Sequence, residues 1–428
     1  MKMAGKGSLA LVSLGCAKNA VDLQVMAGNL VKEGWTLSPD PDRADTAIVN
    51  TCAFIAAARE EAEAEIRRAL ELKRQGRYGR VIVTGCYPQR YPEAAAKFPG
   101  VDGWNGVPEK WVEPKNPALR FTGGAFAYLK IAEGCNHRCS YCAIPSIRGR
   151  YRSRPVASIL REARALLESG CRELVIVAQD PMLYGSDFRK TGARGGKTGL
   201  SDLLWKIEEI GGDFWIRVMY SYPSEIDDDF IAWMLVSERA VRYIDMPIQH
   251  TVPEVLKRMN RARAIDATLT AVDELREFMP DVTLRTTVMT GFPGETDARF
   301  VQLMSDLRRM QFDHLGAFAY SPEKGTKGAL MRGRPSREVA EARAREVMAQ
   351  QAKIWKLKAE AMEGKTFRAL VVAPGVARMA SQAPDVDGVT FIAQGGSHRK
   401  AKVGDFVDVK ILRSKGFDFE GEFVGRGR

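Results

Sequence analysis

The sequence predicts an α/β protein with an N-terminal doubly wound parallel α/β domain, a central partial (β/α)6 barrel and a small C-terminal antiparallel β-barrel. Short β-prone segments alternate with amphipathic helical segments over most of the chain. From residue 365 onward the pattern changes to strands and turns with little helix. The length of 428 residues is also too great for one ordinary domain.

The composition is that of a folded globular protein. Hydrophobic residues make up 45% and charged residues 27% of the chain, which excludes collagen-like and wholly disordered proteins. No apolar stretch approaches the roughly 20 residues that a bilayer-spanning helix needs, so a membrane-spanning role is excluded. The net charge of +11 favours polyanions such as RNA or ribosomes, although a solvated basic surface explains it equally well.

Three cysteines organise the N-terminal third. Cys16, Cys52 and Cys86 each stand at the end of a β-prone segment. These segments are Ser8 to Gly15, Thr46 to Thr51 and Arg80 to Gly85, and they are separated by helical patterns at Asp22 to Glu33 and Ala56 to Gln75. The carboxyl ends of parallel strands line one crevice, so we expect the three thiols to converge. Taken singly, each cysteine could equally be a buried apolar residue.

The central part continues the alternation of strands and helices. Its candidate strands are Ala127 to Ile131, Glu173 to Val177, Trp215 to Met219, Tyr243 to Met246, Thr283 to Met289 and His314 to Ala319. Helical patterns such as Ser158 to Ser169 and Asp266 to Phe278 lie between them. In such a barrel the chemistry belongs to the loops that follow the carboxyl ends of the strands.

A charged helix at Arg337 to Met362 leads to the strand-rich C-terminal segment. Apolar and polar residues alternate there over Phe406 to Leu412 and Phe417 to Val424, which is typical of a small β-barrel. Its basic residues favour RNA contact, with a structural cap as the alternative. We expect domains at residues 7–122, 123–362 and 363–428.

The segment EGCNHRCSYC places Cys135, Cys139 and Cys142 in a short polar loop after a candidate strand. Three thiols so close together indicate a metal site. A 4Fe-4S cluster normally takes four thiolates, so three would leave one iron open to another ligand. Zinc with His137 as a fourth ligand is the alternative, although His137 lies inside the short loop. Cys171 has no partner in the sequence and is expected to be a small buried residue.

The same count of three thiolate ligands applies to the first trio of cysteines, in the N-terminal third. If Cys16, Cys52 and Cys86 meet, they form a second three-cysteine site with an open iron. The seven cysteines are odd in number and sparse, unlike the dense, even set of a small secreted domain. We therefore expect a cytoplasmic protein with no membrane partner.

These residues resemble known motifs. The C-x3-C-x2-C loop, with Tyr141 before its last cysteine, resembles the radical S-adenosylmethionine signature, whose superfamily uses a partial α/β barrel. SLGCAKNAVD, VNTCAFI, VTGCYPQRY, YLKIAEGCNHRCSYCAIPSIRGR and TGFPGETD resemble successive motifs of the methylthiotransferases, and KVGDFVDVKI resembles their OB-like TRAM domain. The resemblance covers nearly the whole chain.

Two segments resemble the RimO type of this family, which methylthiolates an aspartate of a small-subunit ribosomal protein. They are the pair Lys18 and Asn19, where the tRNA-modifying branch typically carries Gln-Met-Asn, and SQAPDVDG at residues 381–388. AKNAVDLQ, MPIQHTVPEVL and ARMASQAPDVDG each depart from the expected pattern by one or more residues. The departures bear on the substrate and leave the reaction class unchanged.

The resemblance implies a chemistry and a set of cofactors. Cys135, Cys139 and Cys142 would hold the cluster that binds S-adenosylmethionine and cleaves it to a 5'-deoxyadenosyl radical, which removes hydrogen from an unactivated carbon. The first trio would hold an auxiliary 4Fe-4S cluster that presents sulfur for methylation and insertion. Inorganic sulfide or polysulfide would supply that sulfur, and a flavodoxin or ferredoxin would supply electrons.

Other residues are candidates for contact with S-adenosylmethionine. Tyr141 lies inside the cysteine loop, and Gly291 and Gly294 in TGFPGE would let the backbone approach the nucleoside, unless this is a plain turn. Two further candidate sites are polar residues at strand ends, Gln179 with Asp180 and Gln249.

Two other functions compete with this one. The first is methylthiolation of an adenosine derivative in tRNA, which the basic C-terminal segment fits equally well. The second is a non-catalytic RNA-binding or ribosome-assembly protein whose cysteines hold structural metal, and it predicts zinc or closed clusters.

Overall fold

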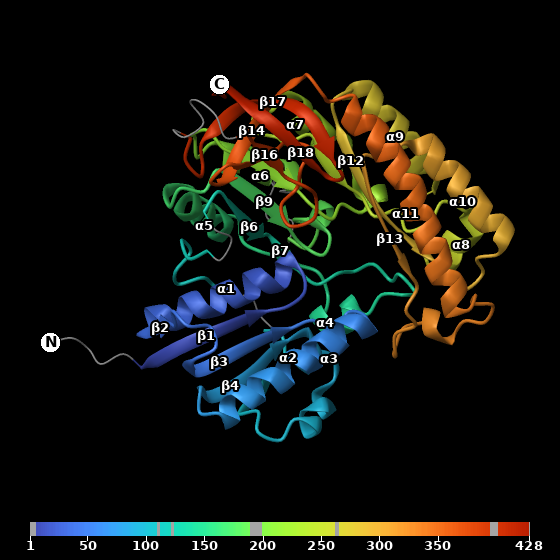
Figure 1. Cartoon of the computed structure of the whole chain (residues 1–428). Coiled ribbons are helices and arrows are strands. Elements are labelled where there is room, and N and C mark those ends of the chain that lie inside the picture. Colours follow the sequence, from blue (N-terminus) through green and yellow to red (C-terminus); the bar gives the residue numbers. More distant parts are fainter. Residues whose placement is uncertain are drawn as a thin grey trace, which may run out of the picture.

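The computed structural model describes residues 6–108, 112–120, 124–188, 199–261, 265–393 and 401–427, without the side chains of 265–271. Three bodies follow one another along the chain (Figure 1). They are an open parallel sheet, a partial barrel and a closed C-terminal barrel. The fold class expected from the sequence is confirmed.

The N-terminal body is a five-stranded parallel sheet with the strand order β2-β1-β3-β4-β5. Its strands are β1 (Gly7–Ser13), β2 (Trp35–Leu37), β3 (Ala44–Thr51), β4 (Tyr78–Gly85) and β5 (Gly103–Asn105). Its helices are α1 (Ala17–Lys32), α2 (Ala56–Arg74) and the short α3 (Cys86–Arg90). Leu23 of α1 packs on one face of the sheet and Ile66 of α2 on the other, so the sheet is doubly wound.

Six parallel strands build the central barrel. They form two three-stranded sheets with the orders β10-β9-β6 and β11-β12-β13, and β10 lies beside β11. The strands are β6 (Phe126–Lys130), β9 (Glu173–Val177), β10 (Trp215–Val218), β11 (Tyr243–Asp245), β12 (Thr283–Thr290) and β13 (His314–Ala319). A small antiparallel pair, β7 (Ala132–Glu133) and β8 (Arg152–Ser153), flanks the cysteine loop.

Helices cover the outside of this barrel (Figure 1). Leu174 and Ile216 on the outer face of the strands pack against Leu203 and Phe230 from the helices. The helices are α4 (Ile144–Arg148), α5 (Val156–Glu168), α6 (Leu200–Glu208), α7 (Asp228–Val236), α8 (Pro253–Arg258), α9 (Ile265–Phe278) and α10 (Asp297–Met310). The inner face is left for the other two bodies to cover.

A long helix, α11 (Arg337–Glu360), lies along β13 and leads to the C-terminal barrel. The barrel strands are β14 (Thr366–Ala373), β15 (Val376–Met379), β16 (Thr390–Ile392), β17 (Phe406–Lys415) and β18 (Asp418–Arg426). They close in the order β14-β15-β16-β18-β17. The sequence predicted an antiparallel barrel, and one contact differs: β16 pairs with β18 in parallel. Between β16 and β18 the chain runs back along β17, which is antiparallel to β18. Strands β16 and β18 therefore run in the same direction.

The C-terminal barrel covers part of the inner face of the central barrel. Tyr128 of β6 donates a hydrogen bond to Asp385 at 2.7 Å, and Tyr243 of β11 donates to Asp387 at 2.6 Å. Both carboxylates belong to the segment between β15 and β16. The opposite end of the inner face meets Val21 and Val25 of α1. All three bodies therefore share one buried core.

A fully buried ion triad strengthens the same contact. The carboxylate of Glu173 on β9 pairs with Arg217 on β10 at 2.7 Å and with Arg378 on β15. None of these three side chains is more than 3% exposed. The two guanidinium groups keep this buried carboxylate ionised, and their remaining N–H groups donate to the carbonyls of Ala380 and Gln382. Elsewhere in the described residues, none of the helices combines the length and the apolarity needed to cross a lipid bilayer.

We expect Glu173→Gln to lower the free energy of unfolding by about 3–5 kcal/mol, because two buried guanidinium groups lose their charged partner. Urea unfolding followed by tryptophan fluorescence measures this, since Trp215 packs against Phe406 of the C-terminal barrel. The matched control is Glu341→Gln, which breaks an exposed pair with Arg337 and should leave the free energy of unfolding nearly unchanged. Equal effects of the two variants would contradict a coupling role for the triad.

Candidate functional site

A cavity of about 530 Å³ lies where the N-terminal sheet meets the central barrel. Its wall includes all six cysteines of the two trios: Cys16, Cys52, Cys86, Cys135, Cys139 and Cys142. The first trio follows β1, β3 and β4, and the second follows the β6–β7 segment. The carboxyl ends of two sets of parallel strands thus open onto one space.

Two glycines let the first trio converge. Gly15, at φ +92°, precedes Cys16, and a side chain there would come within 2.7 Å of the Cβ atom of Cys52. Gly85, at φ +99°, precedes Cys86, and a side chain there would collide with the Thr51 carbonyl at 2.6 Å. Both positions need a positive φ and a missing Cβ. The Gly-Cys pairs therefore bring neighbouring strand ends into contact.

The second trio is held by backbone and hydroxyl hydrogen bonds. The amide of Cys135 donates to the carbonyl of Gly149, and the amide of Cys142 donates to Cys139. Ser140, between the last two cysteines, donates from its amide to Met259 at 3.0 Å and from its hydroxyl to Arg258 at 2.7 Å. The loop is therefore anchored to the end of α8.

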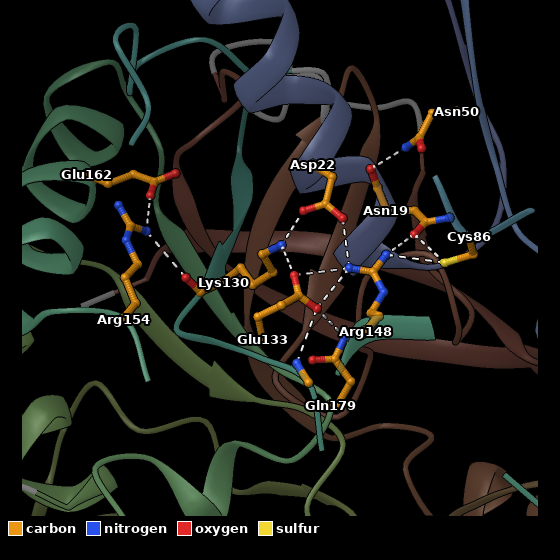
Figure 2. Close-up of polar contacts among 11 residues, drawn as sticks. Asn19, Asp22, Asn50, Cys86, Lys130, Glu133, Arg148, Arg154, Glu162 and Gln179 are labelled. Carbon is orange, nitrogen blue, oxygen red and sulfur yellow. Dashed lines mark hydrogen bonds and ion pairs between the residues drawn. The ribbon is translucent and has the colours of Figure 1, made fainter. Parts of the chain in front are cut away.

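A buried polar network extends from Cys86 of the first trio to Glu133 and Gln179 of the central barrel (Figure 2). Arg148, which ends α4, pairs with Asp22 of α1 at 2.8 Å and with Glu133 at 3.0 Å. Lys130 also pairs with both of these carboxylates. Two cations and two anions therefore alternate across the boundary between the N-terminal sheet and the barrel. Lys130 and Arg148 outweigh the burial that opposes ionisation of Glu133 and hold the pKa of its carboxyl below the ordinary value.

The same arginine reaches the first trio. Its Nη2 atom lies 3.5 Å from the Cys86 sulfur and donates a hydrogen bond to Asn19, whose Oδ1 atom is also 3.5 Å from that sulfur. The side chain of Asn50 donates to the carbonyl of Asn19 at 2.6 Å. A positive charge thus stands beside a thiol that would carry negative charge as a metal ligand.

The thiols differ in acidity. Burial raises the pKa of Cys86 to about 11, and burial likewise raises the pKa of Cys135 to about 11 and that of Cys142 to about 12. Cys16 is exposed to the cavity. Loss of hydration beside the protein raises the pKa of the Cys16 thiol, but the positive charges of Lys18 and Arg148 outweigh this effect. The pKa of Cys16 therefore lies below the ordinary value.

Three of the other residues predicted from the sequence also line this cavity: Tyr141, Gln179 and Gln249. The Oε1 atoms of Gln179 and Gln249 are buried without a hydrogen-bond partner among the described residues, as is the hydroxyl of Ser221 on the same wall. Such atoms fit a ligand that brings its own polar groups, as S-adenosylmethionine does. Gln249 also has a positive φ of 69°, an uncommon conformation that concentrates at functional sites.

Gly291 and Gly294 do not line this cavity. Both have positive φ, but their close neighbours are protein atoms. A side chain at Gly291 would meet Ala340 of α11, and one at Gly294 would meet Arg258. Both glycines therefore allow close packing against these helices, and their approach to a nucleoside stays a prediction.

His137 contacts a carboxylate and an aromatic ring. Its Nε2 atom lies 2.6 Å from Asp180, and its ring stacks on Tyr222 at 3.8 Å. Within the described ranges, no three His, Cys, Asp or Glu side chains are packed closely enough to hold a single metal ion. Cys171, by contrast, is fully buried as expected.

Sequence reasoning missed two arginines of the site, Arg148 and Arg261, which line the cavity. Tyr220 and Tyr222, also on its wall, belong to a loop that follows a candidate strand, where the chemistry was expected. Arg148 acts on Cys86 from 62 positions away in the chain, and such a distance leaves no spacing pattern to recognise. Tyr220 follows a predicted strand, which was the one available signal, and its φ of 72° marks it in the structure.

Comparison with known proteins agrees with this architecture. The Radical SAM superfamily model matches residues 129–307, the uncharacterized protein family UPF0004 matches residues 8–106, and the TRAM domain matches residues 364–424. The ribosomal protein uS12 methylthiotransferase RimO of Trichlorobacter lovleyi is 38% identical over 99% of this chain and 100% of its own length. The RimO protein of Moorella thermoacetica is 39% identical over 97% of this chain and 99% of its own length.

The chain belongs to the RimO family of methylthiotransferases. As a radical S-adenosylmethionine protein of this family, it has the motifs for one 4Fe-4S cluster and S-adenosylmethionine. Solved structures show the same fold at low identity. The radical S-adenosylmethionine methyltransferase TsrM from Kitasatospora setae has a TM-score of 0.52 and 17% identity, over 74% of this chain and 76% of that one. The cobalamin-dependent radical enzyme OxsB has a TM-score of 0.51 and 12% identity, over 76% of this chain and 54% of that one.

The thiol acidities lead to a testable difference in this RimO-family protein. In metal-free protein at pH 8, iodoacetamide should alkylate Cys16 at least about tenfold faster than Cys86, because a lower pKa leaves more reactive thiolate. Peptide mass spectrometry over time measures both rates. Cys171, whose pKa burial raises to about 11, is the matched control and should react as slowly as Cys86. Equal rates for Cys16 and Cys86 would contradict the electrostatic account.

Proposed function

We propose that this protein inserts sulfur and a methyl group at the β-carbon of an aspartate in a small-subunit ribosomal protein. The observation that carries the proposal is the single cavity lined by both cysteine trios. Methylthiolation needs a radical at a carbon atom and a sulfur donor within reach of it. Two open iron–sulfur sites facing one space meet both needs. The relatives named for uS12 methylthiotransferase activity support the choice of substrate.

The two trios take different parts in the proposed reaction. Cys135, Cys139 and Cys142 hold the cluster that binds S-adenosylmethionine, with Gln179 and Gln249 offering acceptor atoms beside it. When bound, this pair supplies a 5'-deoxyadenosyl radical that can abstract hydrogen from an unactivated carbon. Cys16, Cys52 and Cys86 hold an auxiliary 4Fe-4S cluster, and inorganic sulfide or polysulfide is the sulfur source.

The walls of the cavity suit an enclosed radical reaction. Phe54, Ile55 and Ile147 contribute apolar surface between the trios. Tyr141 is held by an edge contact to Phe292 and by a hydrogen bond from Arg261 at 3.3 Å. An apolar wall leaves few groups nearby with which the radical could react in place of the substrate.

The partners follow from the substrate. We propose a flavodoxin or ferredoxin as the electron donor and the cytoplasm as the compartment. The C-terminal barrel contributes RNA contact near the ribosome. Two of its basic residues, Lys410 and Arg413 on β17, pair with Glu422 and Glu420 on β18. These pairs reduce the positive potential of that face, so the barrel contributes only part of the attraction to RNA. Domain boundaries at residues 122 and 362 remain part of the proposal.

The two alternative functions are not favoured. The relatives compared above are named for a ribosomal protein, which disfavours a tRNA adenosine as substrate. A non-catalytic protein with structural metal would have no need for unpaired acceptor atoms around the second trio.

We expect Cys139→Ala to abolish cleavage of S-adenosylmethionine, because the cluster that binds it loses a ligand. Cys52→Ala should retain cleavage and lose at least about 100-fold in methylthiolated product. Liquid chromatography of 5'-deoxyadenosine and mass spectrometry of the ribosomal protein measure the two outputs separately. Cys171→Ala is the control and should retain both. Full product formation by Cys52→Ala would show that the first trio has no role in the reaction.

A further inference from the structure

Lys18 places a positive charge inside the cavity. It lies near the start of α1, two residues after Cys16, and its side chain forms part of the cavity wall. The Nζ atom stands 3.3 Å from the centre of the Tyr220 ring. A cation over an aromatic face is attracted by the ring and keeps its N–H groups available on the other side.

Two arginines also line this wall. Arg148 pairs with Asp22 and Glu133. Arg261 donates to the carbonyl of Pro247 at 2.7 Å and lies 4.1 Å from the centre of the Tyr222 ring. Its Nε atom has no hydrogen-bond partner among the described residues, and its Nη1 atom lies 3.8 Å from the sulfur of Cys139, on the side of the second trio.

Lys18 stands beside the first trio, close enough to Cys16 to act on its thiol. Among the described residues no carboxylate lies within 4.0 Å of its Nζ atom. The positive charges of Lys18 and Arg285 both act on the buried carboxylate of Asp245. Asp245 forms no ion pair with Lys18, however. The backbone of Tyr220 adopts a φ of 72° where its ring meets the ammonium group. An uncommon conformation at such a contact is characteristic of functional sites.

We propose that Lys18 binds the side-chain carboxylate of the substrate inside the cavity and so selects an acidic residue. This inference rests on the function proposed above. A carboxylate that enters an apolar cavity loses hydration, and an unpaired cation offsets that cost. The β-carbon of an aspartate is bonded directly to its carboxylate, so this ion pair also positions the reacting carbon between the two trios. A neutral base would gain nothing from the same charge, which gives discrimination between substrates.

The test is a double-mutant cycle on binding, with the reconstituted protein. The ligand is fluorescently labelled ribosomal protein uS12, either native or with the modified aspartate replaced by asparagine, and anisotropy gives the Kd. For the unaltered enzyme we expect the asparagine form to bind about tenfold or more weakly, because a charged hydrogen bond is lost. Lys18→Met should bind both forms with the weaker affinity, and Lys18→Arg should keep a preference for aspartate.

The controls separate this inference from the proposed function. Lys356→Met, an exposed lysine on α11, should leave both affinities unchanged. Lys18→Gln also removes the charge but keeps a polar side chain, so a folding defect in one of the two variants does not decide the result. Iron–sulfur absorbance checks that each protein is loaded with its clusters. If Lys18→Met and Lys18→Gln keep the preference for aspartate, the role of Lys18 is overturned and the function stands. If the unaltered enzyme neither binds nor methylthiolates uS12, the proposed function fails and this inference fails with it.

Discussion

The arrangement of the site depends on the buried network formed by Asp22, Lys130, Glu133 and Arg148. Asp22 comes from the N-terminal body and the other three from the central barrel, so the network fixes how the two bodies meet. The two positive and two negative charges of the network balance one another. This balance matters because a single buried charge would be strongly unfavourable. Breaking such a network from one side would leave an uncompensated buried charge, which favours this one arrangement of the two bodies. Here the arrangement brings two cysteine trios to one cavity.

The C-terminal barrel makes the same geometry possible from the other side. Its segment between β15 and β16 contacts the inner face of the central barrel through Asp385 and Asp387, and Glu173 of the central barrel pairs there with Arg378 of β15. With that end covered and α1 packed at the other, the inner face of the strands is withdrawn from solvent. The cavity lined by both trios lies at the boundary between the central barrel and the N-terminal sheet.

The sequence predicted most of the strands because their apolar runs and the cysteines that follow them are local features. The bounds of β9 and β13 agree with the expectation to the residue. The network could not be predicted, since Asp22 and Lys130 are 108 positions apart and each resembles an ordinary surface charge. The packing role of Gly291 depends on Ala340 of a distant helix, and the parallel pairing of β16 with β18 depends on how the barrel closes. These are tertiary constraints with no local pattern.

The central claim is that two three-thiolate sites share one cavity, and each would hold a 4Fe-4S cluster. The most direct measurement is iron, acid-labile sulfide and zinc per chain after anaerobic purification and reconstitution. The account predicts about eight irons with matching sulfide. About four irons would contradict the second site, and stoichiometric zinc with little iron would contradict the radical chemistry altogether.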